Sequence, residues 1–388
     1  MDLTYTPEQQ AFRKEARSWL EANIPLEPLA SFDTAEGFEQ HRKWEFRLNA
    51  GGWAMVPWPV EYGGRGSDLF EWLIFEEEYY RVGAPGRVNQ NGIFLLGPTI
   101  MEYGTDEQKA RYLPKMASSE EVWAQGWSEP NAGSDMAAIQ ATAMRDGDHY
   151  VLNGQKTWAS RGAYADWLFG MFRTDPESER HRGITFVLVP LDIPGVTVRP
   201  IEQLDGEAGF AEVFLDDARV PVSNRLGDEN KGWNVAMSTA GFERGLMLRS
   251  PARFQNTARK LVALYRDTAA AGEVDPMLRA AVVRSWMDAE AYTLNTYQTV
   301  TRLLHGGKIG SEASINKIFW SELDVQMHET ALALLGARGE LLPESPGATG
   351  VGDWLDGYLF SLSGPIYAGT NEIQRNVIAE RILNLPRK

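Results

Sequence analysis

Short β-rich runs lie between two helical stretches, and this order constrains the fold of the chain more than any other feature. Turn-forming pairs such as Asp146-Gly147, Asn153-Gly154 and Pro194-Gly195 separate the runs. No helix of about 10–15 residues alternates with them, so the pattern favours an antiparallel sandwich or barrel over a parallel βαβ sheet. The runs cover residues 150–152, 167–172, 185–189, 196–201 and 211–215.

Helical patterns occupy both sides of the β-rich block. Thr6-Pro7-Glu8-Gln9 is typical of a helix start, because Thr6 can cap the helix and Gln9 can close a capping box. The sequence predicts an α+β protein with an N-terminal helical domain (1–120), a central antiparallel β-barrel or sandwich domain (121–230) and a C-terminal helical domain (231–388). The predicted helices cover residues 41–51, 68–81, 233–271, 275–304 and 311–335.

Composition excludes several classes of function. The 388 residues include no cysteine, which excludes a disulfide scaffold, thiol catalysis and cysteine-bound metals. A net charge of −15 argues against a nucleic-acid partner, because binding phosphates requires a basic face. The five histidines lack metal-ligand spacing, so we expect no metal site. The chain shows neither a signal-peptide pattern nor a long apolar run, so we expect a cytoplasmic protein without membrane insertion.

Three segments have residue types suited to binding a polar, flat ligand. Ser128, Gly133 and Ser134 offer hydrogen-bond donors in a loop enriched in proline, asparagine and glycine, although an ordinary surface turn is the alternative interpretation. Trp158 ends a predicted strand and could cover a flat ring, with core packing as the alternative. A turn at 369–371 opens a final helix and would direct N–H groups at an anion or a carbonyl.

These segments belong to a set of five motifs. The motifs are Ser-Glu-Pro-Asn-Ala-Gly-Ser-Asp (128–135), Asn-Gly-Gln-Lys-x-Trp (153–158), Phe-Leu-Asp-Asp-Ala-Arg-Val-Pro (214–221), Gly-Asp-Glu-Asn-Lys-Gly-Trp (227–233) and Ala-Gly-Thr-Asn-Glu-Ile-Gln-Arg (368–375). In this order they resemble the acyl-CoA dehydrogenase family. The resemblance covers essentially the whole chain and implies a helical N-terminal domain, a β-barrel middle domain and a C-terminal four-helix bundle, with FAD in the cleft between them.

The resemblance also implies roles for particular residues. Ser134 and Arg244 match positions that contact the CoA portion of the substrate. An electron-transferring flavoprotein is the expected electron acceptor, in fatty acid or steroid catabolism. The positions that match flavin contacts are Trp127, Ser128, Gly133, Ser134, Trp158, Ser160, Gly369, Thr370 and Asn371.

The family chemistry is α,β-dehydrogenation of an acyl-CoA, which requires a carboxylate base with a raised pKa. Many members carry this base between Tyr and Gly-Thr near the C-terminus, where this chain has Ala368. Alanine accepts no proton, although its backbone N–H could still donate to the thioester carbonyl. A subset of the family takes the base from the first helix after the β domain, and the matching residue here is Glu243.

The helical pattern supports Glu243 independently of the resemblance. Ala236, Ala240, Glu243 and Met247 follow one another at i, i+4, i+7 and i+11, so the glutamate falls on a largely apolar stripe. Burying a carboxylate on an apolar face costs free energy, so such a residue is usually paired with a cation or kept for a function. A salt-bridged or solvated glutamate is the alternative interpretation of the stripe alone.

Two segments that usually contact the FAD of a neighbouring subunit depart from the family pattern. Residues 254–259 lack the Arg-x-x-Phe-Gly motif, and residues 333–339 replace the Gln-x-x-Gly-Gly-x-Gly motif. Both a homotetramer and an α2β2 heterotetramer therefore remain open. The substrate is expected to be a branched, long or bulky acyl-CoA, including a steroid side chain. A flavin oxidase or monooxygenase on the same scaffold and a non-catalytic partner subunit are the alternative functions.

Overall fold

The computed structural model describes residues 3–243, 250–342, 345–348 and 350–386, with only the backbone at Glu243. The chain forms two compact units. We call the first, made of Lys14–Trp72 and Ala84–Glu243, the β unit. The second, made of Met1–Arg13, Leu73–Gly83 and Arg244–Lys388, is the helical unit. Helices α1 (Pro7–Asn23) and α3 (Leu69–Arg81) contribute residues to both.

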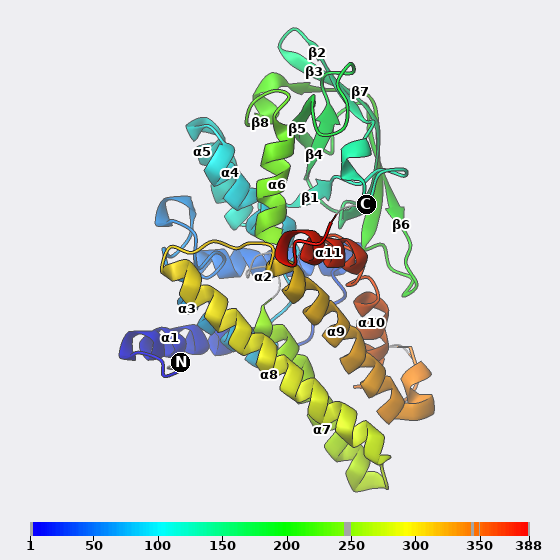
Figure 1. Cartoon of the computed structure of the whole chain (residues 1–388). Coiled ribbons are helices and arrows are strands. Elements are labelled where there is room, and N and C mark those ends of the chain that lie inside the picture. Colours follow the sequence, from blue (N-terminus) through cyan, green and yellow to red (C-terminus); the bar gives the residue numbers. More distant parts are fainter. Residues whose placement is uncertain (1–2, 244–249, 343–344, 349, 387–388) are drawn as a thin grey trace. The chain divides into compact units, whose positions relative to one another are not determined.

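The β unit is built on one eight-stranded sheet in the order β6-β7-β3-β2-β4-β5-β8, with β1 paired to β4 (Figure 1). Its pairings are antiparallel, except that β1 runs parallel to β4 and β2 meets β4 at one parallel pair. The strands are β1 (Trp123–Gly126), β2 (Thr142–Asp146), β3 (His149–Ser160), β4 (Trp167–Arg173), β5 (Ile184–Pro190), β6 (Val196–Ile201), β7 (Phe210–Pro221) and β8 (Arg225–Leu226).

Side chains that alternate along these strands fill the core of the β unit. Tyr150 and Leu152 of β3 and Val213 of β7 are fully or almost fully buried in it. The helices of this unit are α2 (Ala35–Ala50), α4 (Gly97–Tyr103), α5 (Asp106–Ala117) and α6 (Gly232–Glu243). Its short helical turns are η1 (Val60–Tyr62), η2 (Asn91–Leu96), η3 (Met136–Ala138) and η4 (Val222–Asn224).

One predicted turn is wrong. The pair Asn153-Gly154 lies inside β3, opposite an irregular stretch of β7, and does not reverse the chain. Asn153 exchanges hydrogen bonds of 2.9 and 3.0 Å with Asp217 at this irregularity. Gly154 has φ +134° and leaves no room for a Cβ, which would lie 2.7 Å from the Cβ of Ala141. The pair therefore accommodates a bulge in the sheet.

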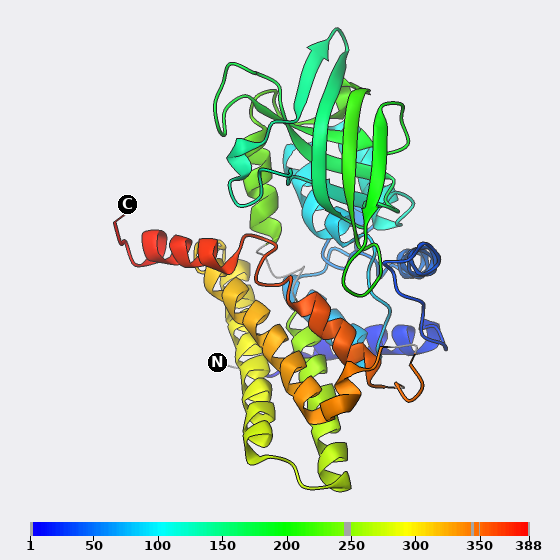
Figure 2. The same cartoon turned by 90° about the vertical axis from the view of Figure 1, so that its right-hand side faces the viewer.

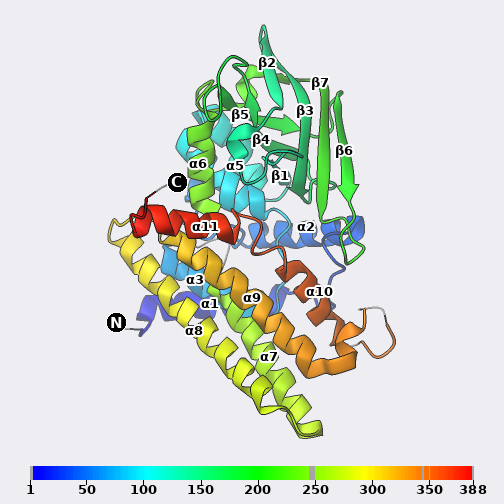
Figure 3. The same ribbon diagram turned by 45° about the vertical axis from the view of Figure 1, so that its right-hand side comes forward.

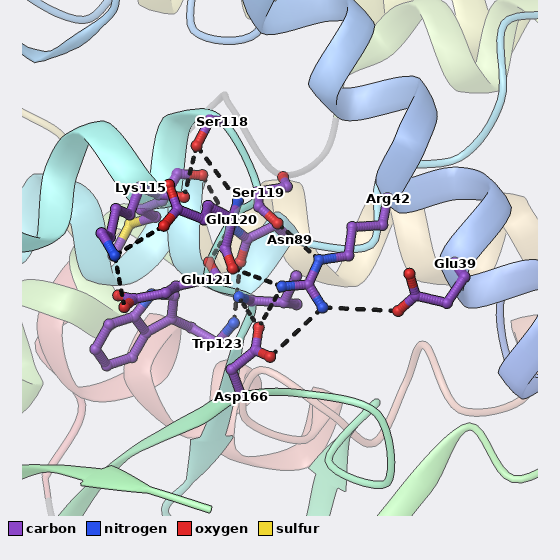
Figure 4. A network of polar contacts seen from close by, with 12 residues as sticks. Glu39, Arg42, Asn89, Lys115, Ser118, Ser119, Glu120, Glu121, Trp123 and Asp166 are labelled. Atoms are coloured by element: carbon purple, nitrogen blue, oxygen red, sulfur yellow. Dashed lines mark hydrogen bonds and ion pairs between the residues drawn. The ribbon is translucent and has the colours of Figure 1, made fainter.

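A partly buried polar network anchors the start of β1 to α2 and to the end of α5 (Figure 4). Arg42 of α2 donates to the carbonyl of Ser119 at 2.9 Å and to the carboxylate of Asp166 at 3.0 Å. Asp166 also accepts the backbone N–H of Val122 at 2.7 Å. Because β1 leads directly into the loop that begins at Trp127, this network fixes where that loop starts.

Asn89 is fully buried in this network. Its side-chain amide donates to the carbonyls of Met116 and Glu121 at 2.9 and 3.1 Å. Its side-chain oxygen accepts the N–H of Trp123, the first residue of β1, at 3.0 Å. The amide thus satisfies three backbone groups that water does not reach.

Three long helices, α7 (Pro251–Ala271), α8 (Pro276–Leu304) and α9 (Ala313–Leu335), run side by side in the helical unit, as Figures 2 and 3 show. The shorter helix α10 (Gly352–Ser361) packs against α9. These helices enclose an apolar core that includes Phe254, Tyr292 and Trp320. The unit also contains α11 (Asn371–Val377) and the turns η5 (Gly336–Glu340) and η6 (Ile378–Ile382). The predicted order of helical, β and helical regions is confirmed.

The predicted helical stretch over 233–271 contains two helices. The first, α6, belongs to the β unit, whereas α7 begins in the helical unit with its own N-cap at Ser250 and a proline at its first position. The Ser-Pro pair is the signal for this second start. Among the described residues, none of the helices combines the length and the apolar character needed to cross a membrane.

Replacing Asn89 with alanine should lower the free energy of unfolding by about 2–3 kcal/mol, because three buried backbone groups would lose their partners. Urea denaturation of the wild-type and variant proteins measures this loss. Arg145→Ala is the control, since Arg145 forms a largely exposed ion pair with Glu229 and should change stability by less than about 0.5 kcal/mol. Equal stabilities of Asn89→Ala and the control would contradict the anchoring role.

Candidate functional site

The loop that follows β1 presents unused hydrogen-bond donors at the surface of the β unit. Gly133 and Ser134 are exposed, and their backbone N–H groups make no hydrogen bond to any described residue. A Cβ added at Gly133 would meet nothing within 4 Å, so the space in front of it is open. Trp127, at the start of the loop, is buried and packs edge-on against Phe186.

The end of β3 lies beside the start of this loop. The N–H of Thr157 donates to the carbonyl of Ser128 at 2.9 Å, which joins the two segments. Within the described residues, the hydroxyls of Ser128, Ser134 and Ser160 have no hydrogen-bond partner. The β unit therefore carries a group of free donors on two adjoining segments, as binding a polar ring edge requires.

Trp158 turns away from the core at a β-bulge. The register of β3 against β7 shifts between Lys156 and Ala159, and Trp158 has a left-handed backbone with φ +60°. Its side chain is 58% exposed, so the core-packing interpretation is wrong for this tryptophan. An exposed indole beside free donors fits a flat, polar cofactor such as a flavin.

A buried ion pair joins these two segments from the inside. Lys156 donates to Glu129 at 2.7 Å and to the carbonyl of Met171 at 2.7 Å. Glu129 belongs to the loop and Lys156 to β3, and both are buried. Burial lowers the pKa of the Lys156 ammonium group, and the Glu129 carboxylate opposes that shift.

In the helical unit, the residues before α11 form a strained turn. Ala368 has φ +56°, a left-handed conformation that costs a non-glycine residue roughly 1–2 kcal/mol. Gly369 follows with φ +80°. The side chain of Gln374 holds both residues by donating to their carbonyls at 3.2 Å. The N–H of Ala368 makes no hydrogen bond to any described residue and remains available as a donor.

A buried lysine also fixes the next residues of this turn. Lys317 of α9 donates to the side-chain oxygen of Asn371 at 2.8 Å, and Ser321 donates to the same atom at 3.2 Å. The side-chain oxygen of Asn371 is thus used inside the helical unit. Thr370 caps α11, because its hydroxyl accepts the N–H of Ile373 at 3.2 Å.

The predicted base lies at the end of α6. Ala236 and Ala240 are buried, which confirms the apolar stripe for the described part of this helix. Glu243 is the last described residue of α6. Its side chain and residues Arg244 and Met247 lie outside the described part of the chain. The roles of Glu243 as the base and of Arg244 as a CoA contact therefore remain predictions.

Sequence reasoning missed the residues that support these segments from within. Lys156, Lys317 and Gln374 are all buried and hydrogen-bonded, although their residue types are usually exposed. Lys156 shares the alternation of Tyr150 and Leu152 along β3, which is a signal for its inward position. The helices offer no comparable local signal for Gln374, because its partners lie in the turn before α11.

Three family models match consecutive parts of the chain. The N-terminal domain of acyl-CoA dehydrogenases matches residues 6–120, the middle domain matches residues 124–218, and the C-terminal domain matches residues 230–383.

Related proteins match over nearly the whole length. Acyl-CoA dehydrogenase IpdE1 of Mycolicibacterium smegmatis is 41% identical, over an alignment that covers 98% of this chain and 99% of that protein. A solved structure described as the Tcur3481-Tcur3483 steroid ACAD has a TM-score of 0.89 at 31% identity over 100% of both chains. The ChsE4-ChsE5 complex from Mycobacterium tuberculosis has a TM-score of 0.84 at 34% identity, also over 100% of both chains. The chain therefore belongs to the acyl-CoA dehydrogenase family and is an oxidoreductase that acts on acyl-CoA.

Proposed function

We propose that this chain binds FAD and oxidises an acyl-CoA thioester to the trans-2-enoyl-CoA, with Glu243 as the base. The observation that carries the proposal is the turn at Ala368, which offers a free backbone N–H but no acidic side chain. A base is still required for α-proton removal, and Glu243 follows the buried residues Ala236 and Ala240 of α6 at helical spacing in the sequence. The bound flavin would supply the hydride acceptor.

Two groups of residues would hold the cofactor. The free donors at Ser128, Gly133, Ser134 and Ser160 and the exposed ring of Trp158 support the first group, on the β unit. Trp127 would contribute from beneath the loop, where it is buried. The second group is Gly369, Thr370 and Asn371 on the helical unit, where we propose backbone contacts because the Asn371 side chain is engaged internally.

The division into domains at 1–120, 121–230 and 231–388 is part of the same proposal. The ranges matched by the three family models support it.

The substrate would be a bulky or branched acyl-CoA, with a steroid side chain as one such group. Ala368 has a small side chain where many family members carry a glutamate, which leaves space on that side. Similarity to a structure described as a steroid ACAD supports this substrate class. Ser134 and Arg244 would contact the CoA portion.

Replacing Glu243 with glutamine should leave substrate binding in place while abolishing flavin reduction, because an amide cannot accept the α-proton. Anaerobic addition of acyl-CoAs to the purified protein, followed by the flavin absorbance, measures reduction. The wild type should bleach with at least one bulky acyl-CoA. Undiminished bleaching by Glu243→Gln would remove Glu243 from the mechanism.

The backbone N–H of Ala368 would donate to the thioester carbonyl and stabilise the negative charge that develops on its oxygen. Ala368→Pro removes this donor and cannot adopt a positive φ, so turnover should fall by at least ~100-fold. Ala368→Gly retains both the N–H and the left-handed backbone, so it should keep turnover within several-fold of the wild type. Wild-type turnover by the proline variant would contradict the assignment.

The electron acceptor would be an electron-transferring flavoprotein, and the assembly a homotetramer or an α2β2 heterotetramer. The two named chains in each of two similar solved structures support the heteromeric form. Light scattering and flavin content of the chain purified alone separate the two assemblies. A flavin-saturated homotetramer excludes the need for an unlike partner, whereas a flavin-free chain that gains FAD only with a second protein supports it.

A further inference from the structure

Lys156 carries an ammonium group into the interior of the β unit, where no part of the residue is exposed. Its Nζ lies 2.7 Å from Oε1 of Glu129, 2.7 Å from the carbonyl of Met171 and 4.8 Å from the ring centre of Phe172. A buried charge is tolerated when it is paired and hydrogen-bonded, and these contacts meet that requirement.

Glu129 closes the loop that carries Gly133 and Ser134. Its carboxylate accepts the backbone N–H groups of Gln140 at 2.6 Å and Ala141 at 3.0 Å. Its own backbone exchanges two 3.0 Å hydrogen bonds with Ala132. One glutamate therefore fixes the loop near its start and at its return to the sheet.

The ion pair with Glu129 also fixes the second segment, the end of β3, through Lys156. Lys156 is the last regularly paired residue of β3 before the bulge that turns Trp158 outward. The residue between them, Thr157, donates its N–H to the carbonyl of Ser128. The ion pair and this backbone bond thus connect the loop to the bulge at two neighbouring points, which defines how far the two segments lie from each other.

Stability alone does not account for such a pair, because replacing both partners of a buried ion pair with neutral side chains is often neutral or stabilising. A neutral pair does not, however, reproduce the hydrogen bonds that Lys156 donates to Glu129 and Met171 and that Glu129 accepts from the loop. We infer that Lys156 and Glu129 are a positioning pair, which holds the loop and the β3 bulge together as a preformed surface for FAD. This inference rests on the proposed function, since it takes both segments to face the flavin.

The experiment compares Lys156→Met, Glu129→Gln and the double variant in the full-length protein. Each single variant leaves a buried charge without its partner, so both should lower the melting temperature. The double variant leaves no unpaired charge and should recover part of that loss. A glutamine offers one acceptor oxygen where the carboxylate offers two, so the N–H of Gln140 or Ala141 still loses its partner.

The double variant should therefore bind FAD at least tenfold more weakly than the wild type, although its melting temperature is partly restored. Fluorescence titration of the flavin-depleted proteins with FAD measures the affinity. Hydrogen exchange in the absence of FAD should also show faster exchange at the Gln140 and Ala141 amides. Recovery of FAD affinity in step with melting temperature, or unchanged protection of both amides, would overturn the positioning role.

A second ion pair, in the helical unit, is the control. Arg13 and Glu78 lie 3.0 Å apart, and Glu78 is almost fully buried. Arg13→Met combined with Glu78→Gln should change the melting temperature but leave FAD affinity within about twofold, because neither residue belongs to the segments proposed to hold FAD. A tenfold loss in this control as well would overturn the specific role of Lys156 and Glu129.

The wild type separates failure of this inference from failure of the proposed function. A wild-type chain that binds no FAD, alone or with a partner, refutes the proposed function and the inference with it. A wild-type chain that binds FAD and is bleached by an acyl-CoA, beside a double variant of equal affinity, refutes the inference alone.

Discussion

An ammonium group that water does not reach must find all its partners within the protein, and Lys156 finds them in Glu129, Met171 and the ring of Phe172. This requirement ties a strand of the sheet to the loop that follows β1. The same carboxylate that pairs with the lysine accepts two backbone N–H groups of the loop. The free donors of Gly133 and Ser134 and the exposed ring of Trp158 are arranged around that connection.

In the helical unit, a second buried lysine holds the turn before α11. Lys317 holds Asn371, and Gln374 holds the carbonyls of Ala368 and Gly369 in their left-handed conformations. In both units the buried side chains use their own polar atoms on the supporting framework. The backbone N–H groups of Gly133, Ser134 and Ala368 make no hydrogen bond to any described residue, and N–H donors are what a cofactor or a thioester carbonyl needs.

The parts of the fold that depend on local chemistry could be predicted from the sequence. The capping box at Thr6 forms as expected, with Gln9 and Thr6 bonded at 3.0 and 3.2 Å. Gly147 and Gly195 adopt the positive φ that their turns require. Asn153-Gly154 has the same composition as a turn but lies within a strand, because the irregularity of β7 opposite it is a property of the pairing and not of the local sequence.

The candidate site could be predicted to a smaller extent, for the same reason. The motifs pointed to the segments that carry free hydrogen-bond donors, and the apolar stripe indicated the helix that ends at Glu243. Simple alternation along β3 would place Trp158 on the same face as Tyr150 and Leu152, but the bulge turns the Trp158 side chain to the opposite face. The partners of Lys156 and Gln374 come from segments distant in the sequence or from a turn, so no sequence pattern within one element predicts them.

The central claim is that Glu243 removes the α-proton in a chain whose C-terminal position, Ala368, lacks a base. The most direct test follows that proton alone, by incubating the enzyme in heavy water with an acyl-CoA analogue that can lose the α-proton but not the β-hydride. The account predicts that the wild type introduces deuterium at the α-carbon and that Glu243→Gln does not, although both bind the analogue. Equal deuterium incorporation by the two proteins would contradict it.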